Sequence, residues 1–267
     1  MGELVRVRGI EMAYDDGGGG GTPVVLLHGF PFDRSMWREQ IESLKDSYRV
    51  IAPDLRGHGQ TSVTGGAATM EEMADDVAAL LDELGVGRVV VGGLSMGGYV
   101  TLAFCRKHAE RVAAVVLADT RPQPDTEEGR RGREKMVELA LREGMAPIAD
   151  AMLPKVLAPQ TLGSKPELVA RVREMILGTN PEGAAAALRG MAARRDQTDL
   201  LPRLGVPALV IVGTEDSVTP PADAEAMHRL IPGSRLVKIE GAGHASNLER
   251  AADFNRALRE FLDGLGD

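Results

Sequence analysis

Short apolar runs alternate with amphipathic helical stretches along most of this 267-residue chain, and this alternation limits its fold more than any other feature. The runs are rich in Val, Ile and Leu, are bounded by Gly, Pro or Asp, and span residues 24–27, 49–52, 88–91, 113–118, 208–212 and 235–239. Strands that are buried on both faces of a parallel sheet have this composition. The helical stretches between them predict an α/β fold with a mostly parallel central sheet and helices on both faces.

Helical periodicity marks five stretches beside these runs, namely residues 35–45, 69–84, 96–108, 222–230 and 248–262. In the second, apolar residues recur at helical spacing, and Gly85 is expected to end the helix. Thr69 and Glu72 resemble a capping box, in which the two residues satisfy free N–H groups at a helix start. The N-terminal segment, residues 4–14, alternates weakly and is interpreted as an antiparallel edge of the sheet.

The alternation stops between Arg121 and Leu204, where no strand run is present. Helix-like stretches cover residues 127–142, 167–177 and 182–194, and five prolines at positions 147, 154, 159, 166 and 181 separate them. An insertion of about eighty helical residues after the sixth strand predicts a cap, or lid, over one edge of the sheet. We therefore expect a core domain formed by residues 1–121 and 205–267 and a helical cap formed by residues 122–204.

The charge distribution argues against two classes of partner. The formal net charge is −8, and no block of Lys and Arg is present. Nucleic acids and anionic membrane surfaces both require clustered basic residues, so neither is expected to bind. No apolar segment reaches the ~18 residues of a transmembrane helix, and none at the N-terminus has the length of a signal peptide. The single cysteine, Cys105, permits no intrachain disulfide. These features favour a cytoplasmic location; the oligomeric state is left open.

One pentapeptide, Gly93-Leu94-Ser95-Met96-Gly97, matches the pattern G-x-S-x-G. It follows the apolar run 88–91 and opens the helical stretch 96–108. A serine on such a sharp strand-to-helix turn projects its hydroxyl above the sheet, and the glycines avoid clashes with neighbouring backbone. In a chain with 32 glycines the bare pattern can also arise as a turn with an accidental serine. Its position between strand and helix favours Ser95 as a nucleophile.

A serine nucleophile needs a base, and His244 is the best-placed histidine. It ends the sequence Gly241-Ala242-Gly243-His244 directly after the run 235–239. The carboxyl ends of parallel strands are where α/β proteins form their sites. His108 and His228 lie within helical patterns and are expected to be surface residues.

The base in turn needs an acid that fixes its tautomer. Asp216 follows the run 208–212 and is the preferred candidate. Asp119, at the end of the run 113–118, and Glu215 are kept as alternatives. Either Glu215 or Asp216 can instead cap the helix that begins after Pro220 and Pro221.

The order Ser95, Asp216, His244 is that of the α/β-hydrolase triad. The chain resembles the α/β-hydrolase fold superfamily over essentially its whole length. His28-Gly29-Phe30-Pro31 resembles the loop after the family's first central strand. This resemblance implies an oxyanion hole formed by the backbone N–H groups of Phe30 and Met96. The segment 54–62 resembles the family's D-x-R-G-x-G-x-S loop, which implies structural roles for His58 and also for His28.

Two further stretches, Ser95-Met96-Gly97-Gly98-Tyr99 and Asp119-Thr120-Arg121, are most similar to small bacterial carboxylesterases and 3-oxoadipate enol-lactonase-like hydrolases. The resemblance implies a serine hydrolase that cleaves carboxylic esters through an acyl-enzyme intermediate. The alternatives are an enol-lactonase, a cofactor-free perhydrolase and a receptor that retains the triad but only binds its ligand. No cofactor is implied, and no His/Cys cluster has metal-ligand spacing.

The cap sequence leaves the substrate undecided. Its Met, Leu and Ala residues are interpreted mainly as helix core. An enol-lactone substrate carries carboxylates, so an arginine directed into the cleft would favour the lactonase alternative. The cap arginines that are candidates for this role are Arg130, Arg131, Arg133, Arg194 and Arg195. Solvated helix faces explain most of them.

Overall fold

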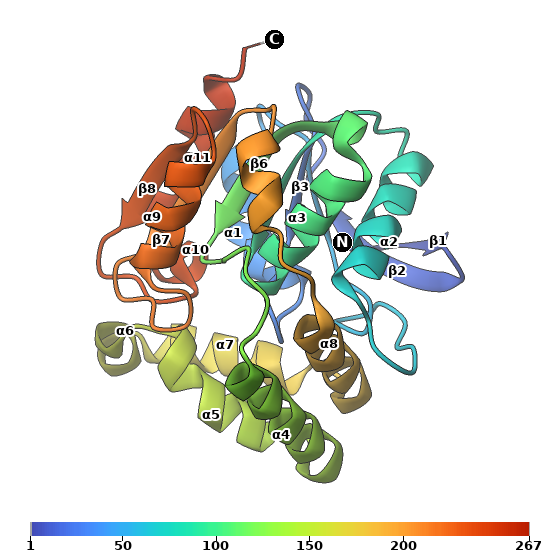
Figure 1. Ribbon diagram of the computed structural model, residues 1–267, viewed down its shortest axis with the longest axis vertical. Coiled ribbons are helices and arrows are strands. Elements are labelled where there is room, and N and C mark those ends of the chain that lie inside the picture. Colours follow the sequence, from blue (N-terminus) through green and yellow to red (C-terminus); the bar gives the residue numbers. More distant parts are fainter. Residues whose placement is uncertain (1, 267) are drawn as a thin grey trace.

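The structure is a computed structural model that describes residues 2–266. Its centre is an eight-stranded sheet with the strand order β1-β2-β4-β3-β5-β6-β7-β8 (Figure 1). The strands are β1 (Glu3–Val7), β2 (Ile10–Asp16), β3 (Val24–Leu27), β4 (Val50–Pro53), β5 (Val89–Leu94), β6 (Val112–Ala118), β7 (Ala208–Gly213) and β8 (Arg235–Ile239). Strands β3 to β8 pair in parallel, whereas β1 and β2 are antiparallel at one edge. The predicted mostly parallel sheet is confirmed, and the weakly alternating N-terminal segment is a hairpin.

Helices cover both faces of this sheet (Figure 1). They are α1 (Arg38–Leu44), α2 (Met70–Glu83), α3 (Met96–Lys107), α9 (Pro221–Leu230), α10 (Ser246–Glu249) and α11 (Ala251–Asp263), with short 3-10 turns η1 (Arg34–Trp37), η2 (Ala109–Arg111) and η3 (Thr198–Arg203). The Thr69 side chain accepts a hydrogen bond from the Glu72 N–H at 3.1 Å, as the capping pattern predicts. The stretch 248–262 differs from expectation. It is divided at Arg250, whose φ of −132° and ψ of 53° interrupt the helix.

The helices between β6 and β7 gather at one end of the molecule, below the sheet in Figure 1. They are α4 (Glu127–Glu143), α5 (Ala146–Val156), α6 (Pro159–Ser164), α7 (Pro166–Leu177) and α8 (Pro181–Ala193). The sequence pattern predicted three helices here and missed α5 and α6. Four of the five prolines lie in the first turn of a helix and therefore start helices, while Pro154 lies inside α5. The helical cap after the sixth strand is confirmed; its boundaries at residues 122 and 204 stay a prediction.

Backbone contacts hold this cap against the core. A Cβ atom on Gly183 of α8 would lie 1.9 Å from the carbonyl oxygen of Gly57, so only glycine permits this approach. The Ala68 N–H donates to the Ala186 carbonyl at 3.0 Å. Just after α7, the buried Thr179 hydroxyl donates a hydrogen bond to the Pro31 carbonyl at 2.6 Å. The cap therefore rests on the loops that follow β3 and β4.

A second seam joins the cap to the loop after β8. The buried Glu249 carboxylate accepts the Gly243 N–H at 2.7 Å with Oε1 and the Ala158 N–H at 2.9 Å with Oε2. The Ala245 N–H donates to the Val156 carbonyl at 2.9 Å. A Cβ on Gly243 would lie 2.6 Å from the Ala158 nitrogen. Cap and core backbones are thus in direct contact beside His244.

A buried ion pair stabilises the core beneath the loop at residues 54–62. Arg56 donates to both carboxylate oxygens of Asp76 at 2.8 and 2.7 Å, and Arg8 adds a bond at 3.2 Å. Asp76 is fully buried and Arg56 nearly so. Removal of Asp76 leaves the buried Arg56 with only its longer contact to Glu72 at 3.7 Å, and breaking a buried pair in this way costs about 3–5 kcal/mol.

We therefore expect Asp76→Ala to lower the free energy of unfolding, measured by urea denaturation, by about that amount. Asp82→Ala serves as the control. This residue lies on the same helix and pairs with Arg111 at 2.7 Å, but its side chain is 67% exposed, so little change is expected. Equal losses in the two variants would contradict a stabilising role for the buried pair.

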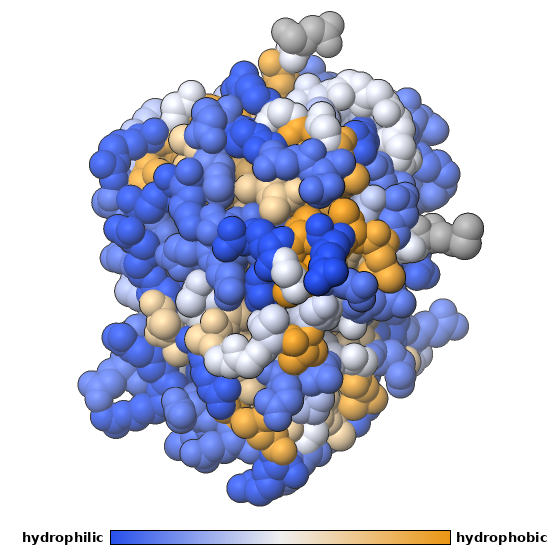
Figure 2. Space-filling view, turned by 90° about the vertical axis from the view of Figure 1, so that its right-hand side faces the viewer, coloured by the Kyte–Doolittle hydropathy of each residue, from blue (hydrophilic) through white to orange (hydrophobic). Residues whose placement is uncertain are grey.

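No helix within residues 2–266 combines the length and the apolar character needed to cross a membrane. The face shown in Figure 2 is largely hydrophilic, with apolar side chains in an interrupted patch at mid-height.

Candidate active site

Ser95 lies at the sharp turn between β5 and α3. Its φ of 55° and ψ of −112° are unusual for a residue with a side chain, a conformation that costs roughly 1–3 kcal/mol. The Ser95 N–H donates to the Ala118 carbonyl at 3.0 Å, and the Thr120 hydroxyl donates to the Ser95 carbonyl at 2.8 Å. The segment after β6 therefore holds the backbone of this turn on both sides.

The two glycines of the pentapeptide are required by close backbone packing. A Cβ on Gly93 would lie 2.2 Å from the carbonyl carbon of Gly97. A Cβ on Gly97 would lie 2.1 Å from the carbonyl oxygen of Leu27. The predicted reason for these glycines is thus confirmed, because any side chain would force the turn, the helix and β3 apart.

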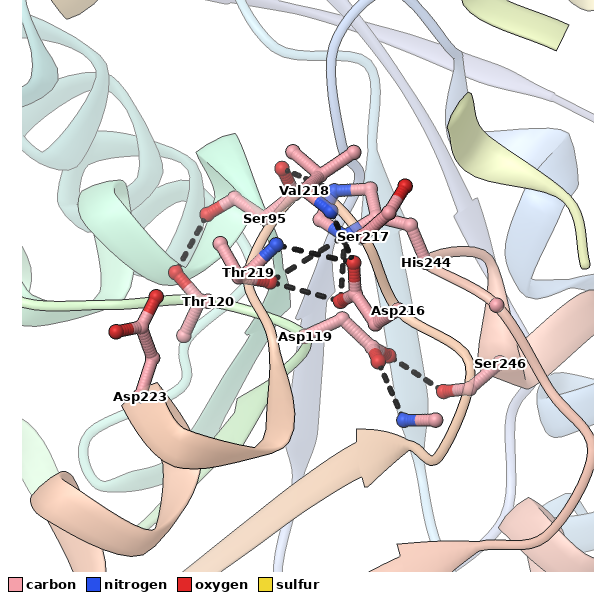
Figure 3. Close-up of polar contacts among 12 residues, drawn as sticks. Ser95, Asp119, Thr120, Asp216, Ser217, Val218, Thr219, Asp223, His244 and Ser246 are labelled. Atoms are coloured by element: carbon pink, nitrogen blue, oxygen red, sulfur yellow. Dashed lines mark hydrogen bonds and ion pairs between the residues drawn. The ribbon is translucent and has the colours of Figure 1, made fainter. Parts of the chain in front are cut away.

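The residues predicted from three separate loops lie together in one hydrogen-bonded row (Figure 3). The Ser95 Oγ lies 2.8 Å from the His244 Nε2, and the His244 Nδ1 lies 2.8 Å from the Asp216 Oδ2. With Nδ1 protonated and donating to the carboxylate, Nε2 is free to accept the serine proton. His244 and Asp216 are buried, while Ser95 is partly exposed. This arrangement can activate a hydroxyl for attack on a carbonyl carbon.

The Asp216 carboxylate is held by its own loop. Its Oδ1 accepts the N–H groups of Val218 at 2.8 Å and Thr219 at 3.0 Å, and its Oδ2 accepts the Thr219 hydroxyl at 2.8 Å. Burial alone would raise the pKa of Asp216, but His244 and the Thr219 bonds outweigh it and hold that pKa below its usual range. The carboxylate is therefore available as an anion to stabilise a charged imidazole. The Thr219 hydroxyl also lies 3.3 Å from the His244 Nδ1.

The other two acid candidates do not contact His244. Glu215 is exposed, and its backbone N–H donates to the Ala242 carbonyl. Asp119 is fully buried but accepts the Gly213 N–H at 2.8 Å and contacts the Ser246 hydroxyl at 2.5 Å. Of the three carboxylates, Asp216 alone bonds to the imidazole ring.

The predicted oxyanion donors have free N–H groups. Within residues 2–266, no protein atom accepts a hydrogen bond from the backbone N–H of Phe30 or of Met96. Met96 is the first residue of α3, where the helix dipole favours negative charge. Phe30 follows Gly29, whose Cβ position would lie 3.3 Å from the Leu94 carbonyl oxygen. The loop that carries Phe30 thus packs against the residue before Ser95.

His28 and His58 occupy structural positions away from the row. The His28 Nε2 accepts the Leu55 N–H at 2.9 Å, and its Nδ1 lies 2.9 Å from the Gly29 carbonyl oxygen. Burial lowers the pKa of His28 to about 4, and burial together with His28 lowers that of His58 to about 3. Both rings are therefore neutral at ordinary pH and join the loops after β3 and β4.

The cap arginines are committed elsewhere or exposed. Arg133 and Arg194 both pair with the buried Asp125, and Arg194 also lies 4.2 Å from the centre of the Tyr99 ring. The remaining three, Arg130, Arg131 and Arg195, are exposed. None of the five therefore has the form of a free guanidinium held for a substrate carboxylate. Within residues 2–266, no group of three His, Cys, Asp or Glu side chains is arranged to hold a metal ion.

Three residues of this site escaped the sequence analysis in their present roles. Thr219 supports the acid, Thr120 holds the Ser95 carbonyl and Ser246 binds Asp119. A hydroxyl residue three positions after Asp216 is a pattern typical of a loop that binds its own carboxylate. The Thr120 and Ser246 contacts join segments far apart in sequence, so no local signal could have indicated them.

Comparisons with known proteins agree with this geometry. A model of the alpha/beta hydrolase fold matches residues 22–251. A thermophilic esterase from Thermogutta terrifontis is 47% identical, with a TM-score of 0.96 and all of both chains covered. The enol-lactonase from Burkholderia xenovorans LB400 is 34% identical, with a TM-score of 0.92 over 98% of this chain and 100% of that one. A 3-oxoadipate enol-lactonase 2 from Acinetobacter baylyi is 32% identical over 85% of this chain and 84% of its own length.

Proposed function

Because this chain belongs to the α/β-hydrolase fold family, we propose that it hydrolyses carboxylic esters through an acyl-enzyme intermediate, with Ser95 as nucleophile. The observation that carries the proposal is the continuous row from Ser95 Oγ through the His244 ring to the Asp216 carboxylate, with both contacts at 2.8 Å. Similarity to an esterase and to enol-lactonases supports ester-type substrates.

The mechanism follows from the donors and acceptors in place. His244 Nε2 takes the hydroxyl proton as Ser95 Oγ attacks the ester carbonyl, and Asp216 stabilises the imidazolium. The N–H groups of Phe30 and Met96 bind the oxyanion of the tetrahedral intermediate. The imidazolium then returns the proton to the leaving alcohol, which departs from the acyl-enzyme. Water, deprotonated by His244, attacks the acyl-enzyme and releases the carboxylic acid and the free serine.

An enol-lactonase with the same catalytic residues is the second candidate, because two of the similar proteins carry that name. The five cap arginines give the lactonase no support. A dicarboxylate lactone needs a guanidinium free to pair with it, whereas Arg133 and Arg194 already bind Asp125.

Stopped-flow release of p-nitrophenol tests this proposal at pH 8, with p-nitrophenyl esters of increasing acyl length. An acyl-enzyme mechanism with slow deacylation predicts a burst of about one equivalent per protein molecule followed by steady turnover. The dependence on acyl length reports the size of the pocket. Carboxylated esters of equal length are the matched comparison and should react more slowly than the neutral ones.

Two results would count against the proposal. A single equivalent of p-nitrophenol without subsequent turnover would fit a ligand receptor that retains the catalytic residues. Preference for carboxylated substrates, with poor turnover of neutral esters, would favour the lactonase.

A further inference from the structure

One buried carboxyl group takes no part in the row from Ser95 to Asp216. Asp119 follows β6 directly, is fully buried and has a φ of 43°, which is uncommon for a residue other than glycine. Such a conformation persists only where surrounding contacts enforce it, and it is concentrated near functional sites. The contacts around Asp119 therefore need an explanation.

The short segment Ala118-Asp119-Thr120 bonds to all three loops that carry the proposed catalytic residues. Its backbone and the Thr120 hydroxyl bind the two sides of the Ser95 turn. The Asp119 Oδ1 accepts the Gly213 N–H, at the start of the loop that carries Asp216. The Asp119 Oδ2 lies 2.5 Å from the hydroxyl of Ser246, two residues after His244. Figure 3 shows Asp119 below Asp216 with both of its bonds.

The same surroundings disfavour a negative charge on Asp119. No cation bonds to its carboxyl group within the described residues, and the carboxylates of Asp216 and Glu249 are its charged neighbours. Burial and then the charge of Asp216 raise the pKa of Asp119 well above its usual range, and the bonds from Ser246 and Gly213 offset only part of this effect.

We infer that Asp119 is a positioning residue that, as a neutral carboxylic acid, holds the loops of Asp216 and His244 against the Ser95 turn. Its Oδ1 accepts the Gly213 N–H, so its proton lies on Oδ2. The Ser246 hydroxyl, which donates to Oδ2 when the carboxyl group is ionised, then accepts the hydrogen bond of that proton instead. Neutrality matters because a second anion beside Asp216 would repel the Asp216 carboxylate, which has to stay ionised to stabilise the imidazolium. The inference rests on the proposed function for its kinetic consequences only.

The decisive comparison is Asp119→Asn against Asp119→Ala. Asparagine matches the neutral acid, with an oxygen for the Gly213 N–H and an NH₂ group for the Ser246 Oγ. We expect Asp119→Asn to keep kcat and KM close to those of the wild type. Asp119→Ala should lower kcat on p-nitrophenyl esters by about 10²-fold with little change in KM, because misplaced loops misalign the base.

Two further kinetic readouts separate positioning from electrostatic action. Removal of an ionised Asp119 would destabilise the imidazolium and move the acid limb of the kcat/KM profile to lower pH. A neutral Asp119 predicts no such movement in Asp119→Asn. As a single variant, Ser246→Ala should lower kcat. Added to Asp119→Ala, it should have little further effect, because both substitutions remove the same hydrogen bond. It also keeps the inference testable if Asp119→Ala fails to fold.

A stability measurement tests the neutral form without any substrate. A carboxyl group that keeps its proton in the folded state but loses it on unfolding makes the wild type less stable as the pH rises above about 4. Asparagine has no such dependence. The stability of Asp119→Asn relative to the wild type, from urea unfolding, should therefore increase from pH 5 to pH 8.

Several outcomes would overturn the inference. They are a loss of kcat in Asp119→Asn equal to that in Asp119→Ala, an acid limb that moves in Asp119→Asn, full activity of Asp119→Ala, and a relative stability that falls with pH. Absence of ester turnover in the wild type would instead refute the proposed function and leave the unfolding result to decide the state of Asp119.

Discussion

Ser95→Ala is expected to lower kcat on p-nitrophenyl esters by roughly 10⁵- to 10⁶-fold, which leaves only the residual catalysis of about 10³- to 10⁴-fold over water that the oxyanion donors and substrate binding supply. The substitution removes the hydroxyl oxygen that lies 2.8 Å from the His244 Nε2. Alanine keeps a Cβ at the same strained turn, so the backbone has no new reason to move. Steady-state rates, the p-nitrophenol burst and the melting temperature should be measured together, and the burst should disappear while the melting temperature remains similar.

Ser217→Ala is the matched control for this variant. Ser217 is exposed and lies beside Asp216, with its hydroxyl 3.4 Å from the Lys155 carbonyl oxygen (Figure 3). Its loss should leave turnover close to that of the wild type. A Ser95→Ala protein that still turned over esters at the wild-type rate would show that another group is the nucleophile.

Asp216→Asn is expected to lower kcat by about 10³- to 10⁴-fold. The asparagine NH₂ group would face the His244 Nδ1, which favours the tautomer with its proton on Nε2. That nitrogen could then no longer accept the proton of Ser95. The variant also loses the negative charge that stabilises the imidazolium. Thr219 would still bond to the amide oxygen, so the fold should be preserved, and thermal unfolding checks this.

Glu215→Gln provides the control for the acid assignment. Glu215 is adjacent in sequence but exposed, and it should tolerate the change without loss of kcat. If Glu215→Gln lost activity and Asp216→Asn did not, the orienting acid would be the neighbouring residue. Parallel pH profiles of the two variants would show which carboxylate supports the base.

The fold could be predicted from the sequence because buried parallel strands leave a plain signal. The run 235–239 coincides with β8, and the run 24–27 coincides with β3. The cap was predicted less completely, because a proline can mark either the end of one helix or the start of the next. Pro159 and Pro166 begin helices here, which only the packing of the cap decides.

The nucleophile Ser95 and the base His244 could be predicted because residue type and place after a strand both pointed to them. The acid was harder to predict, because two aspartates occupy equivalent places in the fold. Asp119 and Asp216 both follow strands of the same sheet, β6 and β7, which are neighbours. Sequence position favoured Asp216 but kept Asp119 as an alternative. The difference arises from tertiary contacts, since Asp216 meets the His244 ring while Asp119 meets Gly213 and Ser246. No pattern along the chain records such contacts.

The seam at Glu249 limits how independently the cap can change during evolution. One carboxylate receives N–H groups from Gly243 in the core and from Ala158 in the cap, beside His244. A different helical insertion would need the same backbone path at residues 156–158, or it would disturb the loop of the base. A change of the cap backbone at residues 156–158 is therefore expected to move the loop of His244 as well, so a new cap has to come with a matching segment at residues 243–249.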